Sequence, residues 1–378
     1  MVYMQTKERK INVELLRIIS MFMIVILHFL GHGGVLKEVN DFSVSYYVSW
    51  IIEAFSFVAV NCYVLITGYF QVNSNIKVQK LLVLWGKTFF YSVVLFVIAI
   101  VFFNIDISFK SLIQVILPVS SGEYWFVSVY IMLYILSPFI NHMLNTIEQK
   151  QHMKLIGVLV ILFSVIPNLA FSSEAIWLED GMGICWFVTL YCTGAYIRKY
   201  YVPTYQKKKL ALVYVCTTLL IPVFKFGVHL FTKVVFGHDI MSGMFYSNNS
   251  VLMLASSVLF FVLILNIRIE NKAICKMVLW LSPATFGVYL IHENPYMRDW
   301  IWSLLNIKKH LHDCYFGVWA IVVVLAIYII CSIVDKIRSC LFIKIEKSQT
   351  LYELSIFIEQ KMQEWTNKIL INGQNKKF

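Results

Sequence analysis

The chain has few charged residues for its length. Only 14% of its 378 residues are Asp, Glu, Lys or Arg, whereas 59% are hydrophobic. Soluble globular domains carry about 25% charged residues, so this composition excludes an ordinary soluble fold. It predicts an all-α polytopic membrane protein that crosses a cell membrane several times, and we expect that membrane to be a bacterial cytoplasmic membrane.

The sequence lacks the motifs of several classes of binding site. The sequence has no Gly-rich phosphate loop, no nucleic-acid motif and no tandem repeat. Its eight cysteines form no C-x-x-C pair and no Cys/His spacing of a zinc site, so we expect no bound metal and no permanently bound cofactor. Only Cys314 falls in a predicted outer loop, and a disulfide framework is therefore not expected. The first apolar run lacks a small-residue cleavage site and is long enough to span the membrane, so we expect a transmembrane helix there and not a cleavable signal peptide.

Apolar runs of membrane-spanning length predict a bundle of about ten transmembrane helices. The predicted spans are 11–31, 48–69, 81–103, 124–144, 154–171, 183–200, 210–231, 248–267, 274–292 and 315–334. Ser282 and Pro283 interrupt the ninth span, so a broken or re-entrant helix is the alternative there.

Basic residues orient the bundle. With the N-terminus inside, 23 of the 32 Lys and Arg residues fall in inner segments and six in outer loops. This asymmetry predicts that both termini are cytoplasmic, and it assigns the net charge of +11 to topology and anionic lipid rather than to nucleic acid. Residues 1–335 then form the transmembrane domain. Residues 336–378 form a basic cytoplasmic tail, predicted to be an amphipathic helix on the inner leaflet, with a disordered tail as the alternative.

Arg17 and His28 are the two strongest polar residues of the first span. Eleven residues make about three helical turns, so the two side chains share one face and lie about 16 Å apart along the axis. An ionisable residue at membrane depth is costly and indicates a functional site. The alternatives are an Arg17 that snorkels to the headgroups and a His28 that makes a packed polar contact.

The predicted orientation sorts the other polar residues by depth. His28, Glu53, Glu123 and His292 fall in the outer part of the bundle, where imidazole and carboxylate groups suit acid/base chemistry on a hydroxyl. Glu123 is predicted to orient His28 or to bind the acceptor. Helix capping by Glu123 and an interfacial role for His292 are the alternatives. Arg17, Lys80 and Lys87 fall in the inner part, where they suit an anionic ligand entering from the cytoplasm.

Several motifs together resemble the integral-membrane acyltransferase family 3. Glu14 to Arg17, followed by His28 and Phe29, is similar to the family's first-helix signature. Further similar patches, in family order, are 63–70, 123–126, 134–138, 186–198 and 285–292.

The resemblance implies a membrane-bound O-acyltransferase, with residues 1–335 as the acyltransferase domain. It implies transfer of acetyl from cytoplasmic acetyl-CoA to a hydroxyl of a cell-envelope or exported polysaccharide or a lipid-linked sugar. Arg17 and His28 match the family's functional pair, so Arg17, His28, Glu123 and His292 are the candidate catalytic residues. An arginine pair that many members carry near the third span is represented here by Lys80 and Lys87, which with Arg17 are the candidate acetyl-CoA ligands.

Two other classes of membrane protein remain as alternatives. A secondary transporter would show two related halves or paired broken helices, and the sequence shows neither. A glycan flippase or polymerase would carry more spans or a large outer loop, whereas the longest outer loop here has about two dozen residues. The sequence does not distinguish among acceptors, and it indicates no oligomeric state.

Overall fold

The computed structural model describes residues 10–103, 105–169, 179–204, 206–311, 313 and 315–374. Every regular element in these ranges is helical. The α-helices are α1 Ile11–Gly31, α2 Val35–Glu38, α3 Val44–Gln71, α4 Val78–Phe103, α5 Phe109–Ile116, α6 Trp125–Thr146, α7 Gln149–Val160, α8 Ile166–Leu169, α9 Ile184–Tyr200, α10 Lys207–Phe236, α11 Val251–Leu265, α12 Lys272–Leu281, α13 Thr285–His292, α14 Pro295–Leu305, α15 Ile307–His310, α16 Phe316–Glu346 and α17 Gln349–Gln374. Cys314 lies outside the described residues, and the described cysteines are free thiols.

Each predicted span falls on one helix or on consecutive helices. The described part of 154–171 corresponds to α7 and α8 with a π-helical turn between them, and 274–292 corresponds to α12 and α13. Within the described residues, eight helical segments are long and apolar enough to cross a membrane. The predicted spans 183–200 and 248–267 correspond to the shorter α9 and α11, which have 17 and 15 residues. The all-α polytopic fold class is therefore confirmed.

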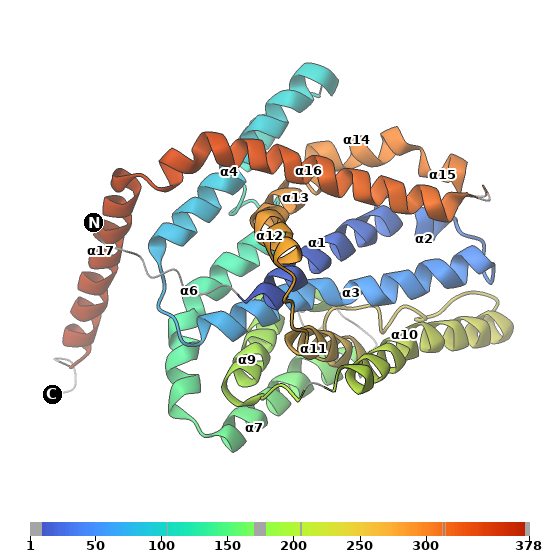
Figure 1. Cartoon of the computed structure of the whole chain (residues 1–378), viewed down its shortest axis with the longest axis horizontal. Helices are drawn as coiled ribbons and strands as arrows, with labels where there is room; N and C mark the ends of the chain where they lie inside the picture. The colour runs from blue at the N-terminus through green and yellow to red at the C-terminus, as the bar shows by residue number, and fades with distance from the viewer. Residues whose placement is uncertain are drawn as a thin grey trace.

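Helix α1 lies in the middle of the bundle (Figure 1). Its buried face contributes to two apolar clusters. Val13 and Leu16 belong to the cluster built with α3, α9 and α11, whereas Val25 and Phe29 belong to the cluster built with α13 and α16. The polar residues of α1 are thus held on a helix that is fixed from several sides.

Helices α3 and α9 cross at two glycines. A Cβ on Gly68 would lie 2.2 Å from the Tyr191 carbonyl oxygen, and a Cβ on Gly194 would lie 2.3 Å from the Leu65 carbonyl oxygen. Small residues let transmembrane backbones approach closely, which replaces the missing hydrophobic drive by dispersion contacts. These two positions therefore admit only glycine at the observed helix separation.

The ninth predicted span, 274–292, is a broken helix, and this confirms the alternative that Ser282 and Pro283 indicated. Residues Ser282–Ala284 form a 3-10 turn between α12 and α13. Pro283 has no backbone N–H and cannot continue the α-helical hydrogen-bond ladder. One turn later, Gly287 lets α13 approach α16, because a Cβ there would lie 2.1 Å from the Asp335 carboxyl carbon.

Helix α16 runs through residue 335 without a break and ends at Glu346. The proposed division of the chain at 335 stays a prediction, as does the membrane-surface position of the tail. Most of the tail that follows α16 is helical, and α17 contacts α4 through the Glu359 carboxylate, which accepts a hydrogen bond from the Val78 backbone amide at 3.0 Å.

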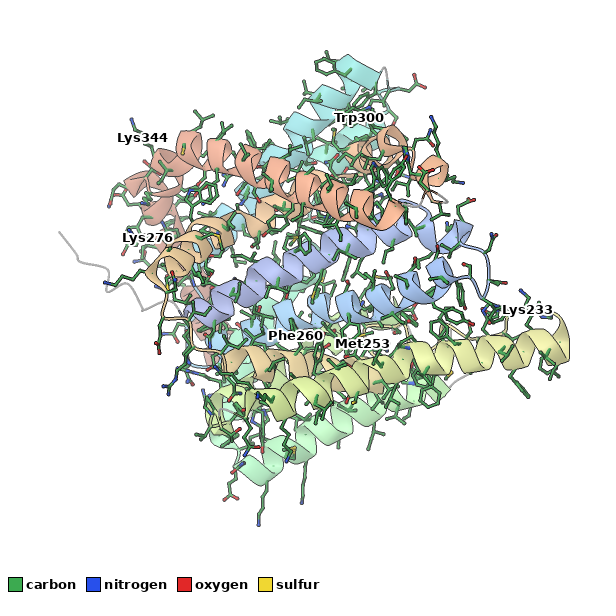
Figure 2. All side chains as sticks on the ribbon, turned by 45° about the vertical axis from the view of Figure 1, so that its right-hand side comes forward. Lys233, Met253, Phe260, Lys276, Trp300 and Lys344 are labelled. Carbon is green, nitrogen blue, oxygen red and sulfur yellow. The ribbon has the colours of Figure 1, made fainter. Side chains whose placement is uncertain are left out.

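Three lysine side chains show which parts of the sequence lie at each end of the bundle. Lys276 and Lys344, both assigned inside from the sequence, lie at one end, and Lys233, assigned outside, lies at the other (Figure 2). This grouping agrees with the predicted topology. Which end is cytoplasmic stays a prediction that rests on the basic residues.

A cysteine at each end of α10 tests the orientation. We expect His238→Cys to react with an impermeant thiol reagent in intact cells, and Lys208→Cys to react only after permeabilisation, because one helix separates these two exposed positions. The measurement is mass-tag labelling of the full chain with its other cysteines removed. The opposite labelling pattern would invert the whole topology.

Candidate active site

A cavity of about 680 Å³ runs along α1 between α3, α4, α6, α13 and α16. Arg17 and His28 both line it, so they share one face of α1 as their spacing predicted. Its polar and charged lining residues include Arg17, His28, Thr67, Gln71, Gln79, Lys80, Lys87, Thr285, Arg338, Ser339, Glu346 and Lys347. The cavity thus joins an imidazole to a group of cations.

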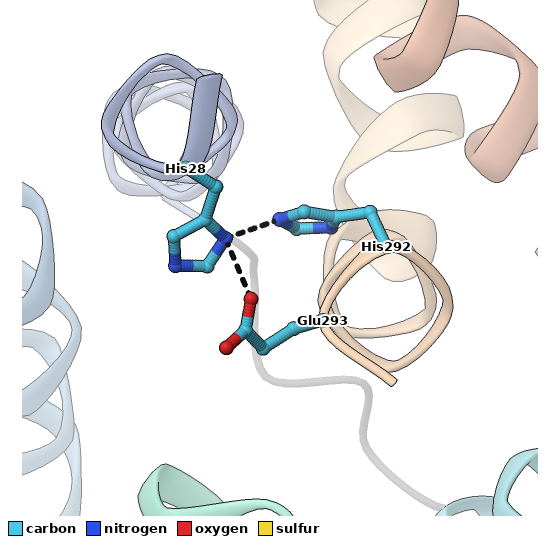
Figure 3. Close-up of side chains that lie close together, drawn as sticks. All are labelled: His28, His292 and Glu293. Atoms are coloured by element: carbon cyan, nitrogen blue, oxygen red, sulfur yellow. Dashed lines mark hydrogen bonds and ion pairs between the residues drawn. The ribbon is translucent and has the colours of Figure 1, made fainter. Parts of the chain in front are cut away.

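Three side chains meet at the imidazole end. His28 Nδ1 lies 2.8 Å from His292 Nε2 and 3.1 Å from the nearer oxygen of Glu293 (Figure 3). His28 comes from α1, whereas His292 is the last residue of α13 and Glu293 follows it directly. The structure therefore brings together two of the predicted catalytic residues, which are 264 positions apart in the sequence.

The hydrogen bonds define the tautomers of the two neutral imidazoles. His292 Nδ1 lies 2.5 Å from the Val288 carbonyl oxygen, which only accepts, so this nitrogen carries the proton. His292 Nε2 is then an acceptor, and His28 Nδ1–H donates to it. The remaining nitrogen of His28, Nε2, keeps its lone pair, and this residue lines the cavity. The arrangement prepares His28 to accept a proton or to attack an electrophile.

Glu293 supports this arrangement with its negative charge. Its other oxygen lies 3.5 Å from His32 Nε2 and 3.1 Å from Arg298 Nη1. Burial alone would raise the pKa of Glu293, but the hydrogen bond with His32 and the neighbouring imidazoles lower it to about 2. A carboxylate 3.1 Å from His28 stabilises the imidazolium that forms when His28 takes a proton.

Glu293 and His32 were not predicted as members of this cluster. Two signals pointed to them: Glu293 directly follows His292, and His32 lies one helical turn after His28. Neither signal shows which outer residues face each other across helices, and only the packing of α1 against α13 does so.

His28, His292 and Glu293 also offer ligand atoms within 4.8 Å of one another. Two nitrogens that each lie about 2.0 Å from a tetrahedral zinc ion are about 3.3 Å apart. The two imidazole nitrogens lie 2.8 Å apart, at the distance of a hydrogen bond. The geometry fits a proton shared between the rings better than a metal ion.

The hydrogen-bond partner of Glu123 is Ser92 on α4. Its carboxylate accepts a hydrogen bond from Ser92 Oγ at 2.9 Å, and burial raises its pKa. The next residue, Tyr124, reaches α13, because its hydroxyl donates to the Leu290 carbonyl oxygen at 3.0 Å. His28 is in contact with His292, Glu293 and His32. A role for Glu123 stays a prediction.

The predicted donor ligands lie along the same cavity. Arg17, Lys80 and Lys87 all line it. The buried Nε of Arg17 has no hydrogen-bond partner and lies 3.9 Å from a Glu14 oxygen. A buried guanidinium nitrogen without a hydrogen bond costs free energy, and an anionic ligand in the cavity would accept one from it. Lys87 Nζ, by contrast, already binds Asp335 Oδ2 at 2.9 Å.

Comparison with known proteins assigns the chain to a family. A family model described as an acyltransferase domain matches residues 10–334, which include both ends of the cavity wall formed by α1. Neither the curated proteins nor the solved structures contain a match to the chain. Because the match covers most of the chain, the chain belongs to acyltransferase family 3 and is a multi-pass membrane acyltransferase.

Proposed function

We propose that the protein is an O-acetyltransferase of a cell membrane, which moves acetyl from cytoplasmic acetyl-CoA to a hydroxyl of a cell-envelope or exported glycan. The observation that carries this proposal is the cavity, which is lined by His28 and by several cations. A phosphorylated donor requires cations, and a hydroxyl acceptor requires a base, so one cavity that supplies both fits this reaction.

The donor would enter with its phosphates among Arg17, Lys80 and Lys87 and its thioester towards His28. Arg17 and His28 are about 16 Å apart along the axis of α1, so only an extended arm can connect them. The pantetheine arm of coenzyme A has this form. It would lie against the aromatic lining residues Tyr63, Phe126 and Tyr130 of the cavity.

His28 Nε2 would take the proton of the acceptor hydroxyl while the oxygen forms a bond to the thioester carbonyl carbon. The C–S bond then breaks, and His28 donates this proton to the leaving thiolate. In the covalent alternative, Nε2 first forms a bond to the acetyl carbon while the C–S bond breaks and coenzyme A leaves as the thiolate. The acceptor oxygen then displaces Nε2 from the acetyl carbon, and the proton of its hydroxyl passes to the thiolate. Both routes place positive charge on the ring, which Glu293 stabilises at 3.1 Å.

Purified protein with acetyl-CoA labelled in the acetyl group tests the proposal. Label found on an added envelope polysaccharide or lipid-linked sugar supports acetyl transfer, and acid-labile label on the protein alone supports the acetyl-histidine route. Labelled donor that enters proteoliposomes without any transfer would instead favour a transporter, and glycan movement without acetylation would favour a flippase or polymerase.

Arg17→Lys is expected to weaken acetyl-CoA binding by about tenfold or more, because lysine lacks the planar fork of donors that binds phosphate oxygens in pairs. Titration calorimetry on the purified variant measures this change. A dissociation constant equal to that of the wild type would show that Arg17 only anchors α1 at the headgroups.

A further inference from the structure

A buried ion network lies where α4, α13 and α16 meet. The Asp335 carboxylate is 2% exposed and accepts three hydrogen bonds. Lys87 Nζ donates to Oδ2 at 2.9 Å, whereas Tyr91 Oη and Arg338 Nε donate to Oδ1 at 2.9 and 3.0 Å. Asp335 therefore fixes the positions of Lys87 and Arg338, both of which line the cavity.

The last part of α16 forms one wall of the cavity. Arg338, Ser339, Glu346 and Lys347 all line it, and all lie beyond residue 334, where the family match ends. Together with Lys80 and Lys87, this wall presents four cations against the anions Asp335 and Glu346. The excess positive charge favours an anionic ligand here.

The Arg338 guanidinium binds two carboxylates. Its Nε binds Asp335, and its Nη1 donates to Glu346 Oε1 at 2.8 Å. Asp335 is fully buried and has three donors, whereas the Glu346 side chain is 29% exposed. The bond to Asp335 is therefore the fixed one, and the bond to Glu346 is the one that a competing anion can replace.

We propose that Arg338 binds a phosphate group of the acyl donor and that Glu346 occupies the guanidinium until the donor arrives. This inference rests on the proposed function, because it names a further ligand of the same donor. Asp335 is a positioning residue, since it aims Arg338 and Lys87 at the cavity. When a phosphate oxygen replaces Glu346 at Nη1, one charge-assisted hydrogen bond is exchanged for another, and the repulsion between Glu346 and the phosphate favours release of the carboxylate.

The proposal predicts opposite effects for the two ends of the Arg338–Glu346 pair. Arg338→Gln is expected to weaken acetyl-CoA binding on the order of tenfold to a hundredfold, because it removes a charged donor to phosphate. Asp335 keeps Lys87 and Tyr91 as donors in this variant. Glu346→Gln is expected to tighten binding a few-fold, because the competing carboxylate is gone. A purely structural ion pair would give no gain of affinity in the second variant.

Lys344→Gln is the matched control. Lys344 is exposed on α16, six residues after Arg338 and at the same end of the bundle as Lys276, but it does not line the cavity (Figure 2). Its loss changes the net charge as Arg338→Gln does, so we expect an unchanged dissociation constant. A loss of affinity in this variant equal to that of Arg338→Gln would reduce the effect to general electrostatics and overturn the proposal.

The experiment is calorimetric titration of the purified full-length protein and its variants with acetyl-CoA, with thermal unfolding of each variant measured alongside. If the wild type binds no acetyl-CoA, the proposed donor itself is wrong. If it binds and Arg338→Gln binds equally well, or Glu346→Gln binds no tighter, the role of Arg338 is wrong while the proposed function stands. Because Glu346→Gln leaves the buried pair with Asp335 intact, its outcome decides the matter even if Arg338→Gln does not fold.

Discussion

Replacing His28 by alanine is expected to lower the rate of acyl transfer by about 10²–10⁴-fold, the usual contribution of a positioned acid/base group. The variant removes the only nitrogen of the cluster that we assign to the reacting atoms, His28 Nε2, and leaves His292 and Glu293 in place. The protein is expected to insert and to bind acetyl-CoA with little change, because alanine costs nothing at this depth. The measurement is initial rate with saturating acceptor, together with a donor titration.

His142→Ala is the control for this variant. His142 is exposed on α6, and it does not line the cavity. Its activity should equal that of the wild type. More than about a tenth of the activity left in His28→Ala would remove the catalytic role from this imidazole.

Gly194→Ala is expected to destabilise the protein strongly. The new Cβ would lie 2.3 Å from the Leu65 carbonyl oxygen and 3.1 Å from the Leu65 Cα, both backbone atoms of α3. A side chain could rotate away, but a helix backbone must move as a whole, so the cost reaches about 3 kcal/mol, the upper end for overpacking. Thermal unfolding in detergent, followed by the loss of monodisperse protein, measures the effect.

Gly157→Ala provides the comparison for that substitution. A Cβ at Gly157 of α7 meets no atom within 4 Å. Alanine is the better helix former by about 0.8–1.0 kcal/mol, so this variant should be as stable as the wild type or more so. Equal melting temperatures for the two alanine variants would contradict the close crossing of α3 and α9.

The helices could be predicted from the sequence because long apolar runs have few alternatives in a membrane. Their ends were harder to predict. The last span was expected to end at 334, where charged residues begin, yet α16 continues to Glu346. The physical reason is that Asp335 and Arg338 neutralise each other and Lys87 in the interior, so these charges do not end the helix. A pattern of hydrophobicity counts such charges as solvent-exposed.

The candidate site also combines features that the sequence predicts with features that it does not predict. The shared face of Arg17 and His28 follows from helix periodicity alone, because both residues belong to one helix. Contacts between helices do not follow in this way. Lys87 stays a predicted donor ligand, but the sequence did not predict its ion pair with Asp335, which lies 248 residues further along the chain. The Glu293 carboxylate beside His28 was missed for the same reason.

The continuity of α16 affects how this protein can be cut or recombined. A chain shortened to residue 334 would retain the whole matched acyltransferase segment but would lose Asp335, leaving the ammonium of Lys87 buried without its counter-ion. Chimaeras with related enzymes are therefore better joined beyond Glu346 than at the family border. A graft of residues 335–346 between relatives would then exchange a cavity wall as one piece, together with the carboxylate that holds it.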